Sequence, residues 1–286
     1  MAEILSGKPV ADAIADEAKR GIETLRPAGV VPCLAIFRVG DDAGDISYER
    51  GAARRMESLG VDVRFYRFET CVSQEDFVRA VREASADDAV HGILLLRPLP
   101  GHIDDAAVRQ ALASAKDVDG ITDGSLAGIY AGADIGFAPC TAEACVRMLD
   151  YYNIPVQGKR ALVVGRSLVI GKPVAMLLLG RHATVTVCHS RSVDIEQVCA
   201  QSDIIVAASG NRDVLSKKCF RSEHVVLDVG IHVDAEGRLT GDVDFEEAES
   251  IVQAITPVPG GIGSVTTAVL ANHVVSAALR QVRHDD

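Results

Sequence analysis

The chain has 286 residues, 48% of them hydrophobic and 24% charged, which is typical of a folded globular protein and excludes a disordered chain, a collagen-like fibre and a coiled coil. The formal net charge of −11 argues against a general nucleic-acid binder, because such proteins present a basic face. The length predicts two domains, and the low aromatic content (4%, no Trp) favours strands alternating with helices over an aromatic-rich β-sandwich.

The seven cysteines and the N-terminal residues both indicate a reducing compartment. No two cysteines are spaced C-x-x-C, and none combines with His at zinc-like spacing, so we expect reduced buried thiols and no metal. The N-terminus lacks the basic and apolar regions of a signal peptide. The apolar stretches fall short of the ~20 residues needed to cross a bilayer. We therefore expect a cytoplasmic protein with no membrane partner.

The first half of the chain alternates between helical and extended patterns. Apolar residues at helical spacing predict helices over Val10–Leu25, Ser47–Leu59 and Ser73–Ala84. Short apolar runs predict strands over Val31–Val39, Val61–Phe68 and His91–Leu96. Strands alternating with helices at this spacing predict crossover connections and a parallel sheet.

The same pattern restarts after Pro139. Four further helices are predicted, over Thr141–Tyr152, Lys172–Leu179, Ile195–Ala200 and Val265–Val282. Four strands are predicted, over Arg160–Gly165, Ala183–Cys188, Asp203–Ala208 and His224–Val229. We therefore expect an α/β protein with two parallel-sheet domains. Residues 1–138 with the C-terminal helix 265–286 form one domain, and residues 139–264 form a Rossmann-like domain.

A glycine-containing turn connects the predicted strand at 160–165 to the helix that follows it. Gly165 ends the strand and Gly171 begins the helix. Glycines at such a turn let the backbone approach a phosphate, and a helix N-terminus supplies N–H donors. The glycines are six residues apart and do not form G-x-G-x-x-G, so a tight turn without a ligand stays an alternative.

The end of the next strand bears on the choice of dinucleotide. NAD sites usually carry Asp or Glu there, whereas this chain has His189-Ser190-Arg191-Ser192. Arg166 in the glycine turn, together with Ser190 and Arg191, could neutralise and hydrogen-bond a 2′-phosphate. We expect NADP rather than NAD, with Arg191 as a solvated surface charge as the alternative.

An ordered set of motifs resembles the methylenetetrahydrofolate dehydrogenase/methenyltetrahydrofolate cyclohydrolase family. The resemblance extends from Ile4 to the last helix. The motifs are Lys116-Asp-Val-Asp-Gly120, Pro139-Cys-Thr141, Gly165-Arg-Ser-x-x-x-Gly-x-Pro173, Cys188-His-Ser190, Gly241-Asp-Val-Asp-Phe245 and Pro257-Val-Pro-Gly-Gly-x-Gly263.

The resemblance implies a bifunctional folate enzyme. The family oxidises 5,10-methylenetetrahydrofolate and often hydrolyses the methenyl product to 10-formyltetrahydrofolate. It is usually a homodimer, with folate in a cleft between the catalytic domain and the NAD(P)-binding domain. The implied cofactor residues are Gly165, Arg166, Ser167, Ser190 and Ile231. Arg191 joins them because of its place after the strand at 183–188.

The resemblance also implies the folate residues. Tyr48 would stack on the ligand and Asp119 would bind the pterin, and both are candidate catalytic residues. The 257–263 loop would border the cleft with Pro259, Gly260 and Gly261.

Two positions depart from the family pattern. Ala52 stands where the family has a Lys four residues after the Tyr, and Leu96 stands where it has Gln. Hydrolysis needs positioned acid–base groups, whereas hydride loss does not, so we expect a dehydrogenase with weak or absent cyclohydrolase activity. Arg55 shares the helix face of Tyr48 and could supply charge, and Arg97 is expected to face away from Leu96. A bifunctional enzyme and a non-catalytic folate- or nucleotide-binding protein are the alternatives.

Overall fold

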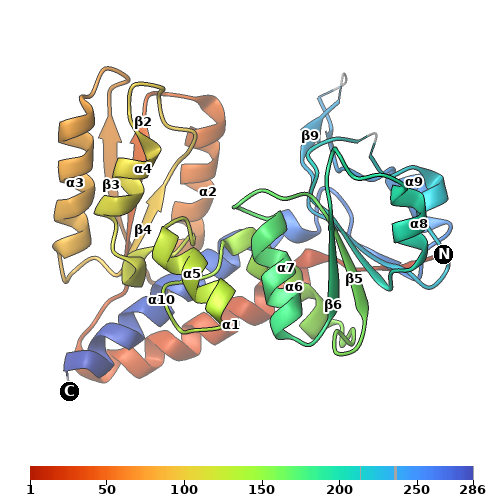
Figure 1. Ribbon diagram of the computed structural model, residues 1–286. Coiled ribbons are helices and arrows are strands. Elements are labelled where there is room, and N and C mark those ends of the chain that lie inside the picture. Colours follow the sequence, from red (N-terminus) through yellow and green to blue (C-terminus); the bar gives the residue numbers. More distant parts are fainter. Residues whose placement is uncertain (213, 235–236, 286) are drawn as a thin grey trace. The chain divides into compact units, whose positions relative to one another are not determined.

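The computed structural model describes residues 1–212, 214–234 and 237–285, so Asp286 of the expected helix 265–286 and three positions of the expected domain 139–264 lie outside the described residues. The chain divides into two compact units (Figure 1). Unit 1 comprises Met1–Asp12 and Thr141–Thr266, and unit 2 comprises Ala13–Cys140 and Thr267–Asp286. Each unit is an α/β structure around a parallel sheet, and this confirms the predicted fold class.

The sheet of unit 2 has three parallel strands in the order β3–β2–β4. The strands are β2 (Cys33–Val39), β3 (Asp62–Phe68) and β4 (Gly92–Leu95). The central strand β2 is buried over nearly its whole length, which matches its continuous apolar sequence. In contrast, β3 is paired along one edge only, and its residues are exposed or half-buried.

Helices cover both faces of this sheet (Figure 1). Their bounds are α1 (Gly7–Leu25, from Ala13 on in this unit), α2 (Ala43–Leu59), α3 (Gln74–Ala86), α4 (Asp105–Ala111), α5 (Asp123–Ala131) and α10 (Thr266–Asp285), with short η1 (Arg26–Ala28) and η2 (Ser114–Lys116). Phe77 and Val81 of α3 pack in one buried cluster with Phe37 and Leu95, which therefore lie on one face. Ala52 and Met56 of α2 are fully buried. The core thus extends to both sides of the sheet.

The C-terminal helix α10 is part of the core of unit 2. A side chain at Gly21 of α1 would have its Cβ 2.6 Å from Val275, so these two helices lie in close contact there. Length and composition alone would let the apolar stretch of α10 cross a bilayer, contrary to our expectation of shorter apolar stretches. Most of that stretch is buried in the protein, as in the core helix of a globular domain.

Unit 1 contains a six-stranded sheet in the order β1–β11–β8–β7–β5–β6, with every pairing parallel. Its strands are β1 (Glu3–Ile4), β5 (Arg160–Val164), β6 (Thr184–Cys188), β7 (Ile204–Ala207), β8 (Val225–Asp228) and β11 (Ala254–Ile255). Because β1 pairs with β11, the first twelve residues belong to unit 1, whereas the sequence pattern grouped them with the helices and strands that follow. A short antiparallel pair, β9 (His232–Val233) and β10 (Leu239–Thr240), extends beyond the sheet.

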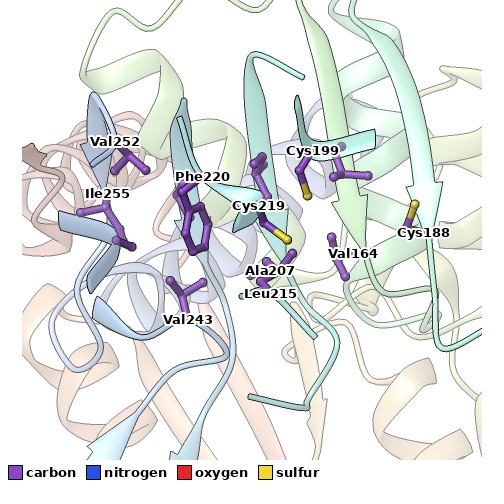
Figure 2. Packing of buried hydrophobic residues seen from close by; sticks show 14 residues of the cluster. Val164, Cys188, Cys199, Ala207, Leu215, Cys219, Phe220, Val243, Val252 and Ile255 are labelled. Atoms are coloured by element: carbon purple, nitrogen blue, oxygen red, sulfur yellow. The ribbon is translucent and has the colours of Figure 1, made fainter. Parts of the chain in front are cut away.

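The helices of unit 1 pack against both faces of its sheet (Figure 1). They are α6 (Cys140–Tyr151), α7 (Gly171–Gly180), α8 (Ile195–Ala200) and α9 (Phe245–Glu249), with short η3 (Lys217–Cys219) and η4 (Ile262–Ser264). Figure 2 shows the cluster under α8 and α9, in which Phe220, Cys199 and Cys219 pack against strand residues such as Val164 and Ala207. All seven cysteines are free thiols, and only Cys71 is exposed.

Candidate active site

The glycine turn after β5 has no room for side chains at its two glycines. Gly165 has a φ of 138°, and a Cβ there would lie 2.0 Å from the carbonyl oxygen of Ala208. A Cβ at Gly171 would lie 2.3 Å from the carbonyl oxygen of Gly165. The backbone therefore folds tightly between the strand and α7, and only glycine fits at either position.

This turn lies at the point where the strand order reverses. From β5 the chain continues to β6 on one side and then returns to β7 on the other side. Val164 is in register with Cys188 of β6 and Ala207 of β7, and Ala207 is in register with Asp228 of β8. The loops that follow these strands therefore meet at one edge of the sheet, which is where open α/β sheets bind ligands.

Ser167 has a structural role within the glycine turn. Its Oγ accepts a hydrogen bond from the backbone N–H of Ile170 at 3.1 Å. It also lies 3.4 Å from the backbone nitrogen of Gly171, at the start of α7. These contacts fix the conformation of the turn, and the neighbouring Arg166 side chain is exposed to solvent.

Ser190 and Arg191 lie in the loop after β6 and are exposed. The backbone N–H of Arg191 donates to Nδ1 of His189 at 3.2 Å, so His189 shapes this loop. No ion pair of Arg166 or Arg191 occurs among the described residues. Both guanidinium groups are therefore open to an anionic ligand at this edge.

The 257–263 loop is also part of unit 1. The backbone N–H of Gly7 donates to the carbonyl of Gly260 at 2.8 Å, and Gly260 has a φ of 100°. Pro259 and Gly260 are exposed, while Gly261 is buried, and a Cβ on Gly261 would lie 2.4 Å from the carbonyl oxygen of Pro257. This loop therefore has a fixed shape with an exposed tip.

The far end of the same loop comes close to the loop after β8. A Cβ on Gly263 would lie 3.9 Å from Cδ1 of Ile231, whose side chain is 66% exposed. The structure thus brings together in unit 1 the predicted residues Gly165, Ser190 and Ile231 at one sheet edge, with the 257–263 loop beside Ile231.

Two buried aspartates, Asp228 and Asp242, join the loops of this edge, and their roles are not evident from the sequence. Asp228, at the end of β8, accepts backbone N–H groups from Gly230, Asp242 and Val243 at 2.9–3.0 Å. Burial raises the pKa of Asp228 to about 6, although these backbone N–H groups oppose the shift. The second aspartate, Asp242, belongs to the Gly241-Asp-Val-Asp-Phe245 motif. The sequence shows this motif, but the contacts of Asp242 form only in the folded chain.

In unit 2, the two predicted folate residues come together near Cys140. Tyr48 lies on α2, and Asp119 lies in the turn before α5. Burial, and next the charge of Asp119, raise the pKa of the Tyr48 hydroxyl, which therefore lies close to that carboxylate. The Tyr48 side chain is still 38% exposed, so part of it is accessible to a ligand.

The surroundings of Asp119 combine burial with several polar groups. Burial raises its pKa to about 6, and a hydrogen bond from Cys140 opposes that shift. Asp117 raises the pKa further, whereas His273 and Arg97 lower it. His273 is held by a contact of 2.8 Å between its Nδ1 and the carbonyl of Val118.

The positive charge of Arg97 thus lowers the pKa of the Asp119 carboxyl. Its Nε lies 2.8 Å from Oδ1 of Asp105, and its Nη2 lies 2.8 Å from Oδ2 of the same residue, so the guanidinium is held in a fixed position. Leu96 before it is buried, and Arg97 is exposed, which agrees with the expectation that their side chains point in different directions.

A buried ion-pair network holds α2 against the sheet beside Tyr48. Glu49 is only 3% exposed and accepts hydrogen bonds from Arg38 of β2 at 3.1 Å and from Arg67 of β3 at 2.7 Å. Burial alone would raise the pKa of Glu49, but the hydrogen bonds from Arg67 and Arg38 outweigh it and lower the pKa. The network therefore fixes the register of α2, and with it the place of Tyr48.

The two departures from the family pattern are both buried. Ala52 has no exposed surface and Leu96 is 6% exposed. Arg55, one helical turn from Ala52, is half-buried, and no ion pair of its side chain occurs in the part of the chain that the structure describes.

Within residues 1–212, 214–234 and 237–285 there is no cluster of three or more His, Cys, Asp or Glu side chains that could hold a metal ion.

Family models match most of the chain. Residues 5–119 match the tetrahydrofolate dehydrogenase/cyclohydrolase catalytic domain, and residues 139–282 match the NAD(P)-binding domain of the same family. The chain belongs to the tetrahydrofolate dehydrogenase/cyclohydrolase family. It is an enzyme of this family.

Individual relatives of the family support the same assignment. The bifunctional protein FolD of Carboxydothermus hydrogenoformans is 48% identical over 97% of this chain and 97% of its own length. The crystal structure of the FolD dehydrogenase/cyclohydrolase from Campylobacter jejuni has a TM-score of 0.95 at 34% identity and covers 98% of this chain and 99% of its own. The FolD of Trypanosoma brucei, solved with NADP cofactor and inhibitor, has a TM-score of 0.91 at 32% identity over 99% of each chain.

Proposed function

We propose that this enzyme oxidises 5,10-methylenetetrahydrofolate to 5,10-methenyltetrahydrofolate with NADP as the hydride acceptor. The observation that carries the proposal is the glycine turn at the reversal point of the unit 1 sheet, which is flanked by exposed Arg166 and Arg191. The Trypanosoma brucei relative with NADP is consistent with the same cofactor here.

The residues at this sheet edge fit a dinucleotide with a 2′-phosphate. The close backbone approach at Gly165 and Gly171 suits the pyrophosphate, and Ser167 sets the turn that presents it. Arg166, Arg191 and the Ser190 hydroxyl would hold the 2′-phosphate, because the four residues 189–192 directly after β6 carry no carboxylate to repel it. The backbone of Ile231 would contact the nicotinamide end.

In unit 2, Tyr48 and Asp119 would hold the folate. The accessible part of the Tyr48 ring gives the pterin a surface on which to stack. The ionised Asp119 carboxylate would accept paired N–H groups from the amino-pyrimidinone edge. Pro259, Gly260 and Gly261 of the 257–263 loop would complete the folate contacts. In this proposal, unit 2 corresponds to the expected catalytic domain and unit 1 corresponds to the expected NAD(P)-binding domain.

The two chemical steps of the family place different demands on these residues. The nicotinamide supplies the hydride acceptor, and removal of hydride from the methylene carbon requires no proton transfer. Tyr48 and Asp119 therefore need only to orient that carbon. Hydrolysis of the methenyl cation requires water to lose protons and a ring nitrogen to gain one, so it depends on positioned acid–base groups.

The apolar residues at positions 52 and 96, where the family has Lys and Gln, support a weak cyclohydrolase. The buried side chains of Ala52 and Leu96 can neither donate nor accept a proton. An arginine is a poor base because its guanidinium stays protonated, so neither Arg55 nor Arg97 replaces a lysine of lowered pKa. We therefore propose that dehydrogenase activity exceeds cyclohydrolase activity in this enzyme.

A bifunctional enzyme that makes 10-formyltetrahydrofolate is the second candidate. The relative that is 48% identical bears the name of a bifunctional protein. In addition, Arg97 lowers the pKa of Asp119 and is held by Asp105, so a fixed positive charge is present near the proposed folate residues. This charge could stabilise a hydroxide or an oxyanion during hydrolysis.

We further propose that the enzyme is a cytoplasmic homodimer. The long edge strand β3 supports this, because one of its edges is unpaired and the Phe65 side chain is 42% exposed. Two copies of such a strand could pair antiparallel about a two-fold axis.

One assay separates these proposals. The purified protein is incubated with 5,10-methylenetetrahydrofolate and either NADP or NAD, and reduced nicotinamide and methenyl absorbance are followed separately. We expect reduction with NADP to exceed that with NAD, and methenyl product to accumulate. A methenyl signal that decays as fast as it forms would favour the bifunctional enzyme, and no reduction with either cofactor would refute the proposed function.

A further inference from the structure

Asp242 joins two loops at the cofactor edge of unit 1 and is almost completely buried, with 1% of its surface exposed. Its Oδ2 accepts the backbone N–H groups of Ser209 and Gly210 at 2.7 and 2.9 Å, and the Ser209 hydroxyl at 2.9 Å. These residues follow β7. One oxygen of Asp242 therefore fixes the loop after β7.

The other oxygen of Asp242 holds the loop after β8. Nε2 of His232 lies 2.7 Å from Oδ1 of Asp242. His232 directly follows Ile231, and Gly230 precedes it. A Cβ at Gly230 would lie only 2.2 Å from the same Oδ1, so the backbone passes directly over the carboxylate.

Asp228 fixes Asp242 in turn. It accepts the backbone N–H of Asp242 at 3.0 Å, and its own N–H donates to Oγ1 of Thr256 at 2.7 Å. Thr256 immediately precedes the 257–263 loop. Three chain segments beside the dinucleotide edge thus depend on one chain of buried hydrogen bonds.

We propose that Asp242 is a positioning residue for hydride transfer: through His232 and the backbone of Ser209 and Gly210, it sets the place of the Ile231 segment relative to the loop after β7. The inference deepens the proposed function and rests on it. Asp242 itself is enclosed by protein groups, so it acts through these loops and does not bind the cofactor directly. Small displacements of a group that orients the reacting carbon lower the rate strongly.

The test compares two variants of this contact with a control from the same motif. Asp242→Asn loses one acceptor, and His232→Ala removes the His232 contact from a side chain that is 24% exposed and is therefore replaceable without opening the core. Asp244→Asn is the matched control, because Asp244 lies two residues further on and caps α9 through the N–H of Glu247, a role that Asn also fills.

For each variant, we would measure the dissociation constant of NADPH by fluorescence, kcat and KM for both substrates, and the melting temperature. We expect His232→Ala to lower kcat about tenfold and Asp242→Asn more strongly. Both should raise the NADPH dissociation constant at least threefold, with the KM for the folate within twofold of that of the unchanged protein. His232→Gln, which keeps an N–H donor, should recover most of the loss.

The double variant gives a further check. If the two residues act through one contact, Asp242→Asn with His232→Ala should lose no more kcat than Asp242→Asn alone. Unchanged kcat and NADPH binding in folded His232→Ala and Asp242→Asn would overturn the inference, as would equal losses in Asp244→Asn. Failure of the proposed function is a separate result, because it would appear as absent folate-dependent reduction in the unchanged protein, whereas NADPH binding would still report on Asp242.

Discussion

Ala52 and Leu96 are the residues at which the expected chemistry of this enzyme differs from that of its family. Both are buried, so polar replacements would meet a site that is shaped for apolar groups. A lysine at position 52 alone would leave an ammonium poorly satisfied, at a cost above the roughly 1–3 kcal/mol of a neutral polar group. A glutamine at position 96 could accept a hydrogen bond from that lysine only if the side chains at positions 52 and 96 lie in contact.

The double variant Ala52→Lys/Leu96→Gln is therefore expected to increase cyclohydrolase activity by at least tenfold. The reason is that a lysine of lowered pKa can transfer the protons that hydrolysis requires. The measurement is the decay of methenyltetrahydrofolate absorbance, with no dinucleotide present. Leu96→Gln alone is the control. A double variant that hydrolyses no faster than that control would contradict the assigned role of these positions.

Asp119 leads to a pH prediction. Burial raises its pKa to about 6, so the carboxylate is ionised above that pH and protonated below it. Since only the ionised form accepts paired N–H groups from the pterin, kcat/KM for the folate should fall by about tenfold per pH unit well below pH 6. The pH–rate profile between about pH 4 and pH 8 checks this.

Asp119→Asn should be slower at all pH values and should lack this acid limb.

The effect of Asp119 on stability has the opposite pH dependence to its effect on activity. Because the folded pKa lies above the ordinary value, Asp119 contributes most to stability at low pH, and this contribution is lost as the pH rises from about 4 to about 6. An unchanged acid limb in Asp119→Asn would assign that titration to another group.

At the scale of elements, α2 depends on Glu49 for its position on the sheet. Glu49→Ala would remove the buried carboxylate partner of Arg38, which is 7% exposed and keeps the exposed Asp41 as its other partner. Because Asp41 stays, the cost should lie below the about 3–5 kcal/mol of a buried charge that loses its partner altogether. We expect urea unfolding at a lower midpoint and a higher KM for the folate, since Tyr48 precedes Glu49 on the helix. Glu57→Ala, at an exposed position of α2, should change neither value.

The turn between β5 and α7 gives a second prediction at this scale. Gly165→Ala would bring a Cβ within 2.0 Å of a backbone oxygen at a φ of 138°. The turn must therefore open, and we expect loss of NADPH binding together with destabilisation of at least about 1 kcal/mol. Gly180→Ala is the matched control, because a Cβ at Gly180, the last residue of α7, meets no atom within 4 Å. Equal NADPH affinity in both variants would contradict the phosphate-binding role of the turn.

The sequence predicted the longer elements well because their periodicity is local. The helix predicted over Ile195–Ala200 coincides with α8, and Ser73 caps α3 through the N–H of Asp76 as its position suggested. In contrast, β1 and β11 have two residues each and exist because of pairing with distant segments: β1 pairs with β11, and β11 pairs with both β1 and β8, which no local pattern reveals. The short helices α4, α5 and α9 were likewise not predicted.

The candidate site likewise combines features that the local sequence predicts with features that depend on contacts between distant segments. The glycine turn and the arginines beside it could be found from sequence because their chemistry is tied to strand ends. The role of Asp242 could not, because its partners Ser209 and His232 come from other segments of the chain. For Asp119, the sequence suggested the residue, but its pKa is raised by burial and by Asp117, and the burial could be known only from the fold.

At the scale of the whole molecule, β3 sets the proposed assembly. Phe65→Lys would place a charge on the exposed part of the edge strand, where a second copy would pair. We expect a shift from dimer to monomer by size-exclusion chromatography with light scattering. Leu239→Lys, at an exposed apolar position of unit 1, should leave the mass unchanged. A dimer that persists in the Phe65 variant would place the interface elsewhere.

The pairing of β1 with β11 has a consequence for how this protein is made. Unit 1 requires both Met1–Asp12 and β11, which the ribosome produces only after the whole unit 2 segment Ala13–Cys140. Unit 2 likewise requires α10, which follows the unit 1 segment Thr141–Thr266. Neither unit can be completed from one uninterrupted stretch of the nascent polypeptide, and the apolar face that awaits α10 stays uncovered while Thr141–Thr266 is synthesised. Chaperone engagement with Ala13–Cys140 is thus expected during that interval.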